Sequence, residues 1–249
     1  DLDGEITGAR GRLNGQAFEG LHTRMQYAGG TLTLTGLRSS VAGGRLAGSL
    51  VLDVAKGTPS YLFSGTTSDV DIGALASAGF SGVDAVRGRM SGHMVGVGDG
   101  PRVQLMGDVT LGSGSIRGVA FDRVHAIFWH DAGGAVDLDY LSGQVGGATI
   151  YSSGRIGPDG ALDLDVLAND LSFADLGARA GLGDAPLDGR AELMGRASGT
   201  TAAPVFSGTV AATHGRVGPI AFAEAQGRFA ATPAGLTSLD LDLLNGSAR

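Results

Sequence analysis

The stretch Gly157-Pro158-Asp159-Gly160-Ala161-Leu162-Asp163-Leu164-Asp165-Val166 decides the fold class of this chain. Its second half alternates apolar and acidic residues. Successive side chains of a β-strand point to opposite faces, so the alternation predicts a strand with one apolar and one polar face. Its first half predicts a turn, because proline presets φ and glycine accepts positive φ. A turn followed by an alternating strand is the element from which the fold is predicted.

The same element recurs along the chain. Residues 32–35, 136–140 and 239–243 alternate in the same way, and glycine-rich turns stand at 43–44, 98–100 and 112–114. At about twelve residues for a strand and its turn, the whole chain is expected to hold about twenty strands. The sequence therefore predicts an all-β protein whose mostly antiparallel sheet is elongated and curled.

A long period lies over this local pattern. Phe18 returns as Phe121 and again as Phe222, at spacings of 121 − 18 = 103 and 222 − 121 = 101 residues. Further matches keep the same order: residues 29–34 match 133–138, and residues 68–72 match 169–173. A fixed period indicates one structural unit stacked along an axis, with function on a continuous surface.

The period divides the chain into repeat unit 1 (1–112), repeat unit 2 (113–212) and a partial unit 3 (213–249). Two alanine-rich stretches at matching places, 71–78 and 174–180, predict one short helix per repeat of about 102 residues. The chain begins with Asp1 rather than methionine and stops where the earlier copies continue, so a fragment of a longer protein is expected.

Composition limits the function classes. The chain has 249 residues with 45 glycines, no cysteine and a net charge of −7. The negative charge argues against a nucleic-acid partner, which needs a basic surface. The lack of cysteine excludes disulfides and thiolate chemistry. The chain has no run of about 18 apolar residues, so no transmembrane helix is predicted.

The order of elements over nearly the whole chain resembles a known family. A short helical stretch is followed by Pro186-Leu187-Asp188-Gly189, a strand, Ser198-Gly199-Thr200 and Pro204-Val205-Phe206-Ser207-Gly208-Thr209-Val210. Further strands and Asn245-Gly246 complete the order, which resembles the repeats of bacterial AsmA-like and TamB proteins. The first copy departs from it, with Val83-Asp84 where Pro-Leu stands in the later copy and Gly98-Asp99-Gly100-Pro101 in place of Gly-Thr.

The resemblance implies a curled β-sheet with a hydrophobic groove in the periplasm of a diderm bacterium. The full-length protein would be anchored in the inner membrane through a part that this fragment lacks. Its implied partners are phospholipid acyl chains moving toward the outer membrane. For TamB members, the resemblance also implies outer-membrane protein assembly with a barrel partner. No cofactor and no catalytic residue are implied.

The alternating apolar residues are the candidate lining of the groove, and an ordinary sandwich core is the alternative. The candidates are Leu32, Leu34, Val136, Leu138, Leu162, Leu164, Leu239 and Leu241. The repeated aromatics Phe18, Phe121 and Phe222 are interpreted as a core plug in each unit, with a lipid-contacting ring as the alternative.

Other chemistry finds little support. His125 and His130 lie near Asp122 and Asp131, but their odd spacing places them on opposite faces of a strand, which argues against a metal site. The acidic pairs at 137/139, 163/165 and 240/242 lack the nonapeptide pattern of a calcium β-roll and predict a solvated strand face. Residues 96–100 lack the lysine of a phosphate loop. The sequence predicts no enzyme.

Two other functions fit a glycine-rich β-protein. A secreted adhesin or autotransporter passenger with a β-helical stalk is the main alternative, although such stalks favour shorter rungs than about 102 residues. A carbohydrate-binding sandwich would need an exposed aromatic platform. With one tryptophan and four tyrosines, the chain offers little material for one.

Overall fold

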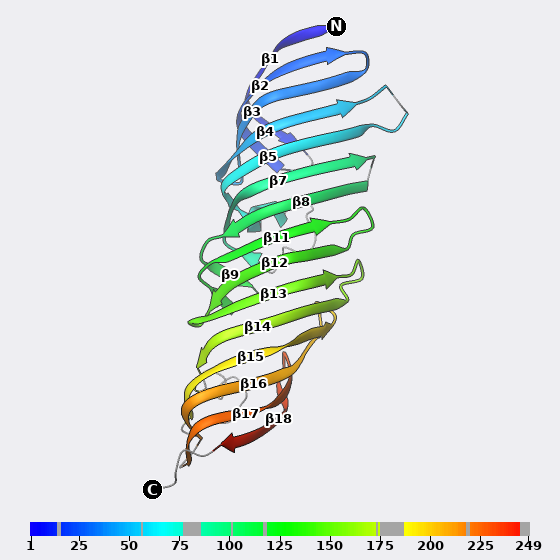
Figure 1. Ribbon diagram of the computed structural model, residues 1–249. Helices are drawn as coiled ribbons and strands as arrows, with labels where there is room; N and C mark the ends of the chain where they lie inside the picture. The colour runs from blue at the N-terminus through cyan, green and yellow to red at the C-terminus, as the bar shows by residue number, and fades with distance from the viewer. Residues whose placement is uncertain are drawn as a thin grey trace. The chain divides into compact units, whose positions relative to one another are not determined.

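The computed structural model describes residues 1–13, 16–55, 57–76, 86–100, 102–116, 119–172, 174, 187–217 and 220–244. Within them it has eighteen strands and a single described helix, and every strand pair is antiparallel (Figure 1). The prediction of an all-β, mostly antiparallel curled sheet is confirmed. The chain divides into two compact units, Asp1–Ala135 and Val136–Arg249.

In unit Asp1–Ala135, eight strands follow one another in a sheet, each antiparallel to the next. They are β1 (Leu2–Leu13), β2 (Gln16–Ala28), β3 (Thr31–Val41), β4 (Gly44–Asp53), β5 (Ser60–Asp71), β7 (Arg89–Asp99), β8 (Arg102–Leu111) and β11 (Val124–His130). Helix α1 (Ile72–Ala76) follows β5. A small second sheet has the order β10 (Val119–Phe121), β9 (Gly114–Ile116), β6 (Val86–Arg87).

In unit Val136–Arg249, seven strands follow one another in the same antiparallel way. They are β12 (Val136–Val145), β13 (Ala148–Ile156), β14 (Leu162–Ser172), β15 (Leu187–Gly199), β16 (Pro204–Val217), β17 (Ile220–Thr232) and β18 (Gly235–Leu244). Strands β15, β16 and β17 bend along their length (Figure 1). The sheet of this unit is therefore curled.

Two-residue turns at matching places join β3 to β4 and β12 to β13. The first turn has φ of 49° at Ala42 and 72° at Gly43, and the second has 58° at Gly146 and 84° at Gly147. Positive φ at both central residues defines the type I′ turn, whose twist matches that of the flanking strands. The glycine pair accepts this conformation freely, whereas Ala42 adopts it against its preference.

The core of unit Asp1–Ala135 lies at one end of its strands. Its larger buried apolar side chains are Val70, Ile72, Val109, Phe121 and Val124. The strand β5 ends at this core in helix α1, which begins after Asp71. The Asp71 carboxylate accepts hydrogen bonds from the backbone N–H groups of residues 73 and 74 at 2.8 and 3.4 Å, and so caps the helix.

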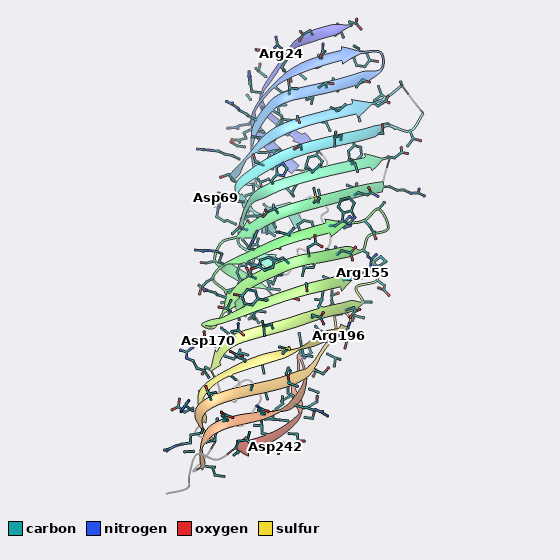
Figure 2. The ribbon with its side chains drawn as sticks, viewed as in Figure 1. Arg24, Asp69, Arg155, Asp170, Arg196 and Asp242 are labelled. Atoms are coloured by element: carbon teal, nitrogen blue, oxygen red, sulfur yellow. The ribbon has the colours of Figure 1, made fainter. Side chains whose placement is uncertain are left out.

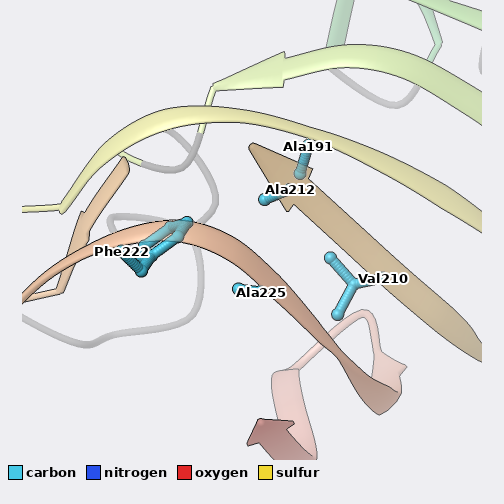
Figure 3. Packing of buried hydrophobic residues seen from close by; sticks show 5 residues of the cluster. All are labelled: Ala191, Val210, Ala212, Phe222 and Ala225. Atoms are coloured by element: carbon cyan, nitrogen blue, oxygen red, sulfur yellow. The ribbon is translucent and has the colours of Figure 1, made fainter. Parts of the chain in front are cut away.

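The core of unit Val136–Arg249 is built largely from alanine. Ala191, Val210, Ala212, Phe222 and Ala225 form one buried cluster on strands β15, β16 and β17 (Figure 3). Five larger apolar side chains pack against it while keeping part of their surface exposed: Leu171, Leu193, Phe229, Leu241 and Leu243. Small side chains allow the bent strands to approach closely, and the larger ones pack against the cluster.

Each repeated phenylalanine covers a glycine on the strand beside it. The cross-strand pairs are Gly11 with Phe18, Gly114 with Phe121 and Gly215 with Phe222. A Cβ added at any of these three glycines would collide with the phenylalanine ring. Phe121 and Phe222 are buried, at 4% and 5% exposure, and Phe18 is half-buried. The role of the repeated phenylalanines, as core plugs or as a lipid-contacting ring, stays a prediction, and their glycine partners were not singled out from the sequence.

The period also appears in backbone conformation. Asp69 and Asp170 stand at matching places, and both have φ of 60° at a register shift. Each is paired with an arginine of the next strand: Arg89 Nε lies 2.5 Å from Asp69 Oδ1, and Arg190 Nη1 lies 3.7 Å from Asp170 Oδ1. Figure 2 labels Asp69 near an end of β5 and Asp170 near an end of β14. The two copies thus share an unusual local structure.

The predicted helices lie partly outside the described residues, and the predicted repeat boundaries differ from the limits of the compact units. Of the second predicted helix, 174–180, only Ala174 lies within the described residues. The first predicted helix, 71–78, is observed as Ile72–Ala76, with residues 77–78 outside the described part. The compact units divide after Ala135, so the repeat boundaries at residues 112 and 212 stay a prediction drawn from the period.

Candidate functional site: a half-buried apolar face

The predicted residues Leu32 and Leu34 lie on the face of their sheet that also carries the buried core. We call this the apolar face and the opposite side the outer face. In register, Leu32 stands between Tyr27 of β2 and Leu52 of β4. Leu34 stands between Met25 and Leu50 in the next row along the strands. The four leucines and the methionine of these two rows are all half-buried: Met25, Leu32, Leu34, Leu50 and Leu52.

The same two rows continue across the sheet. Leu50 is opposite Phe63 and Leu52 is opposite Tyr61 on β5. The next strand places glycine beneath both rings, because Phe63 pairs with Gly96 and Tyr61 with Gly98. A Cβ at either glycine would collide with the ring above it. The glycines therefore let the aromatic rings lie flat along the apolar face.

In unit Val136–Arg249, four predicted residues share one patch of the apolar face. Leu138 and Leu164 both stand opposite Gly154 of β13, and Val136 and Leu162 both stand opposite Ile156. All four are half-buried. Glycine at the centre of the patch leaves the two leucines to cover the middle strand. The structure thus brings these four candidates together.

The last two candidates divide between the core and the exposed face. Leu241 packs against the buried cluster of this unit. Leu239 is opposite Phe229 and keeps 41% of its surface exposed. Leu241 thus packs with the core, Leu239 is the more exposed of the two, and groove lining stays a prediction.

The burial of the large apolar side chains falls from one end of the strands to the other. In β5 the side chain of Val70 is 2% exposed, while Phe63 and Tyr61 toward the other end are half-buried. At the far end of the apolar face, Tyr27 and Phe206 of the two units reach 37% exposure. Each unit therefore has a closed core end and an apolar end that the described side chains cover only in part.

Two buried hydroxyl groups stabilise the irregular points of β2 and β3. Thr23 Oγ1 donates to the carbonyl of Thr35 at 3.0 Å, and Ser39 Oγ donates to the carbonyl of Glu19 at 3.0 Å. Each acceptor precedes a glycine with φ of 61°, Gly36 and Gly20, where the ladder of the sheet shifts register. Side-chain donors thus satisfy carbonyls that the interrupted ladder leaves without a partner.

The outer face of unit Val136–Arg249 carries ion pairs. Arg155 Nη1 lies 2.7 Å from Asp137 Oδ2, and Arg196 Nη2 lies 2.7 Å from Asp163 Oδ1. Arg196 Nε also lies 3.5 Å from Asp165 Oδ1. Arg155 and Arg196 are labelled in Figure 2. The prediction of a solvated acidic face is confirmed for these aspartates, and the arginines opposite them were not foreseen, because pairing depends on register.

The outer face of unit Asp1–Ala135 has an apolar ladder instead. Leu62 stands opposite Val51 and Val97, and Met106 stands opposite Val95 and Trp129. Leu62 and Met106 are 47% and 48% exposed. The signal that could have found it is the run Tyr61-Leu62-Phe63, where apolar residues occupy both faces of one strand.

The histidines lie as their odd spacing predicts. His125 is opposite Thr110 on the outer face, where its Nε2 lies 2.8 Å from Asp108 Oδ1. His130 is opposite Leu105 on the apolar face. In the part of the chain that the structure describes, no three His, Asp or Glu side chains gather as metal ligands would. That same part contains no helix with the length and apolarity needed to cross a membrane.

Comparison with known proteins identifies no relative of this chain. Neither the protein-family models, nor the curated proteins, nor the solved structures contain a match to this chain. The candidate site is therefore defined by its own geometry: an apolar face, repeated in each unit and only partly covered.

Proposed function

We propose that the apolar face of each unit holds the acyl chains of phospholipids, and that the chain is a periplasmic segment of an AsmA/TamB-like protein that carries lipids between the inner and outer membranes. The observation that supports this is the partial exposure of two aligned apolar rows. Across strands β2, β3, β4 and β5, one row consists of Tyr27, Leu32, Leu52 and Tyr61, and the other of Met25, Leu34, Leu50 and Phe63. In a folded sheet, such rows are normally covered by a second layer.

The chemistry of the rows suits an acyl chain. Removing a methylene group from water stabilises a complex by about 0.8 kcal/mol when it is fully buried, and by less on an open face. Leucine and phenylalanine offer purely apolar contact, and tyrosine adds a ring face with a single hydroxyl at its end. Because neighbouring strands present similar side chains, a bound chain meets no single deep trap and can move from strand to strand.

Strand pairing argues against the main alternative. A β-helical stalk stacks its rungs as parallel strands. Here the described strands pair with their neighbours in antiparallel order within each unit. The lipid-binding proposal uses the face that this antiparallel order creates.

The test compares two substitutions on adjacent residues of β3. Leu34→Asp places a charge on the apolar face, and Thr33→Asp places the same charge on the outer face, one residue away. Each protein is purified from a bacterial host, its fold is checked by circular dichroism, and organic extracts are analysed by mass spectrometry. We expect phospholipid with the wild type and Thr33→Asp, and several-fold less with Leu34→Asp.

Two results would contradict the proposal. Folded wild-type protein that carries no lipid would indicate an apolar face filled by the protein itself. Equal loss of lipid in the two variants would indicate that the lipid is held by general surface charge or by unfolding rather than by the apolar rows.

A further inference from the structure

A hollow of about 490 Å³ lies in unit Val136–Arg249, lined in large part by side chains of the outer face. The residues that give it its chemistry are Asp139, Tyr140, Tyr151, Leu167, Met194 and Arg196. Tyr151, Leu167 and Met194 stand directly opposite one another on β13, β14 and β15. One apolar row thus forms one wall of the hollow.

A β-bulge supplies the end of this wall. Leu138 pairs with Gly154 and Leu141 with Ser152, so Asp139 and Tyr140 together oppose one residue, Ser153. A bulge of this kind turns a side chain away from strict alternation. It brings the Tyr140 ring to 6.4 Å from the Tyr151 ring, centroid to centroid, with the planes tilted by 52°.

The side chains that line the hollow differ from those at the matching places of the other unit. The matching bulge in unit Asp1–Ala135 is at Thr35-Gly36, where no aromatic or acidic side chain is present. The places that match Tyr151 and Leu167 are Ala47 and Thr66. A sheet needs neither tyrosine at these points, because the other copy of the same bulge forms without them.

The second wall is charged, with negative charge in excess. Arg196 is already engaged, since it contacts Asp163 at 2.7 Å and Asp165 at 3.5 Å. Among the described residues, no cation is paired with Asp139. The lining therefore presents two carboxylates, Asp139 and Asp165, against one guanidinium.

The apolar wall is unusually accessible. Met194 is 66% exposed, the highest value among the exposed large hydrophobic side chains of the described residues. Tyrosine, methionine and arginine are the residue types enriched at the centres of protein–protein interfaces. An exposed Met194 beside two tyrosines and a carboxylate without a cation is the arrangement expected of an anchor pocket rather than of a solvated strand face.

We propose that this hollow receives a basic side chain, arginine or lysine, of a partner polypeptide. The aliphatic stem of that side chain packs on Leu167 and Met194, as long cationic side chains do on apolar surfaces. The cation lies against the Tyr140 and Tyr151 rings and meets the Asp139 carboxylate. This inference is independent of lipid binding, which uses the opposite face.

The experiment follows the methyl resonance of Met194 by NMR in the folded chain, assigned with the variant Met194→Leu. The probes are two tripeptides, acetyl-Leu-Arg-Leu-amide and its neutral counterpart with citrulline in place of arginine. We expect a saturable shift of Met194 with the arginine peptide and binding weaker by about fivefold with the citrulline peptide. Asp139→Asn should weaken binding of the arginine peptide by about threefold.

The matched control is Asp240→Asn, which removes a carboxylate of the same outer face on β18, away from the hollow. It should leave binding unchanged. A Met194 resonance that does not move with peptide, or equal effects of Asp139→Asn and Asp240→Asn, would overturn the proposal. Met194 shifts that grow with protein concentration in the absence of peptide would also contradict the proposal. They would indicate that an arginine of a second copy of this chain, and not of a different polypeptide, fills the site.

Discussion

The two compact units resemble each other on their apolar faces and differ on their outer faces. In one, Thr33, Val51 and Leu62 stand in a row across β3, β4 and β5. At the matching row of the other, Asp137, Arg155 and Asp163 stand across β12, β13 and β14. On the apolar face, by contrast, Leu34 is matched by Leu138, and in the core Phe121 is matched by Phe222. The repeat has therefore kept what closes the sheet and varied what faces away from it.

The difference separates two kinds of requirement. The glycine–phenylalanine pairs and the positive-φ aspartates shape the backbone, so every copy needs them. The outer face contributes little to folding, since exposed substitutions usually change stability by within about 0.5 kcal/mol. Its residues are free to serve separate partners, and Tyr140 and Tyr151 of the hollow are matched by Gly36 and Ala47 in the other copy.

The largest effect is expected where the copies agree most closely. Phe222→Ala and Phe121→Ala should each lower the free energy of unfolding by about 3–5 kcal/mol, because each removes a buried ring and exposes or empties the space over a glycine. Phe18→Ala should cost less, since Phe18 is half-buried. Denaturant unfolding followed by circular dichroism measures the three values. A Phe18→Ala loss as large as that of Phe222→Ala would show that burial does not explain the pairs.

A smaller effect should distinguish the two aspartate–arginine pairs. Asp69→Ala forces alanine into a left-handed conformation, at about 1–2 kcal/mol, and also removes the contact with Arg89. Asp170→Ala should cost slightly less, because its arginine is more distant, at 3.7 Å. Asp69→Gly should recover most of the loss, since glycine accepts this φ.

The control for that series is Asp242→Ala, which removes an aspartate without positive φ. Thermal unfolding should show almost no change for it. If Asp69→Gly were as unstable as Asp69→Ala, the ion pair and not the backbone conformation would be the reason that aspartate recurs.

The smallest effect is expected on the outer face itself. Arg155→Leu copies the apolar character of Val51 into the other unit and removes the contact with Asp137. Because both partners are partly exposed, we expect a loss below about 1 kcal/mol at low salt that shrinks further as salt screens the charges. Unfolding at two ionic strengths checks this. A loss of stability that does not change with salt would indicate that Arg155 stabilises the fold through packing and not through its charge.

Several features were predictable from sequence because they depend on local order. The alternation around Leu34 and Leu164 predicted the strands and placed both residues on one face. The match between residues 68–72 and 169–173 indicated equivalent places, which the structure shows as the same φ at Asp69 and Asp170.

Other features depend on which residues lie opposite one another, and no single strand contains that information. Arg155 meets Asp137 only through the register of β12 and β13. The glycine under each phenylalanine stands seven residues before it, a spacing that acquires meaning once the two strands pair. The register shifts near Gly20 and Gly36 are likewise not revealed by alternation alone.

The nearest-neighbour order of the strands has a consequence for biosynthesis. Within the sheet of each unit, a strand pairs with the one completed just before it, apart from the short detours through α1, β6, β9 and β10. As the chain leaves the ribosome, the preceding strand is already available as a template for the next, and little of the protein must wait for its last residues. Growth by whole hairpins also leaves the pairing of earlier strands untouched, so the same rule that assists synthesis permits lengthening by duplication.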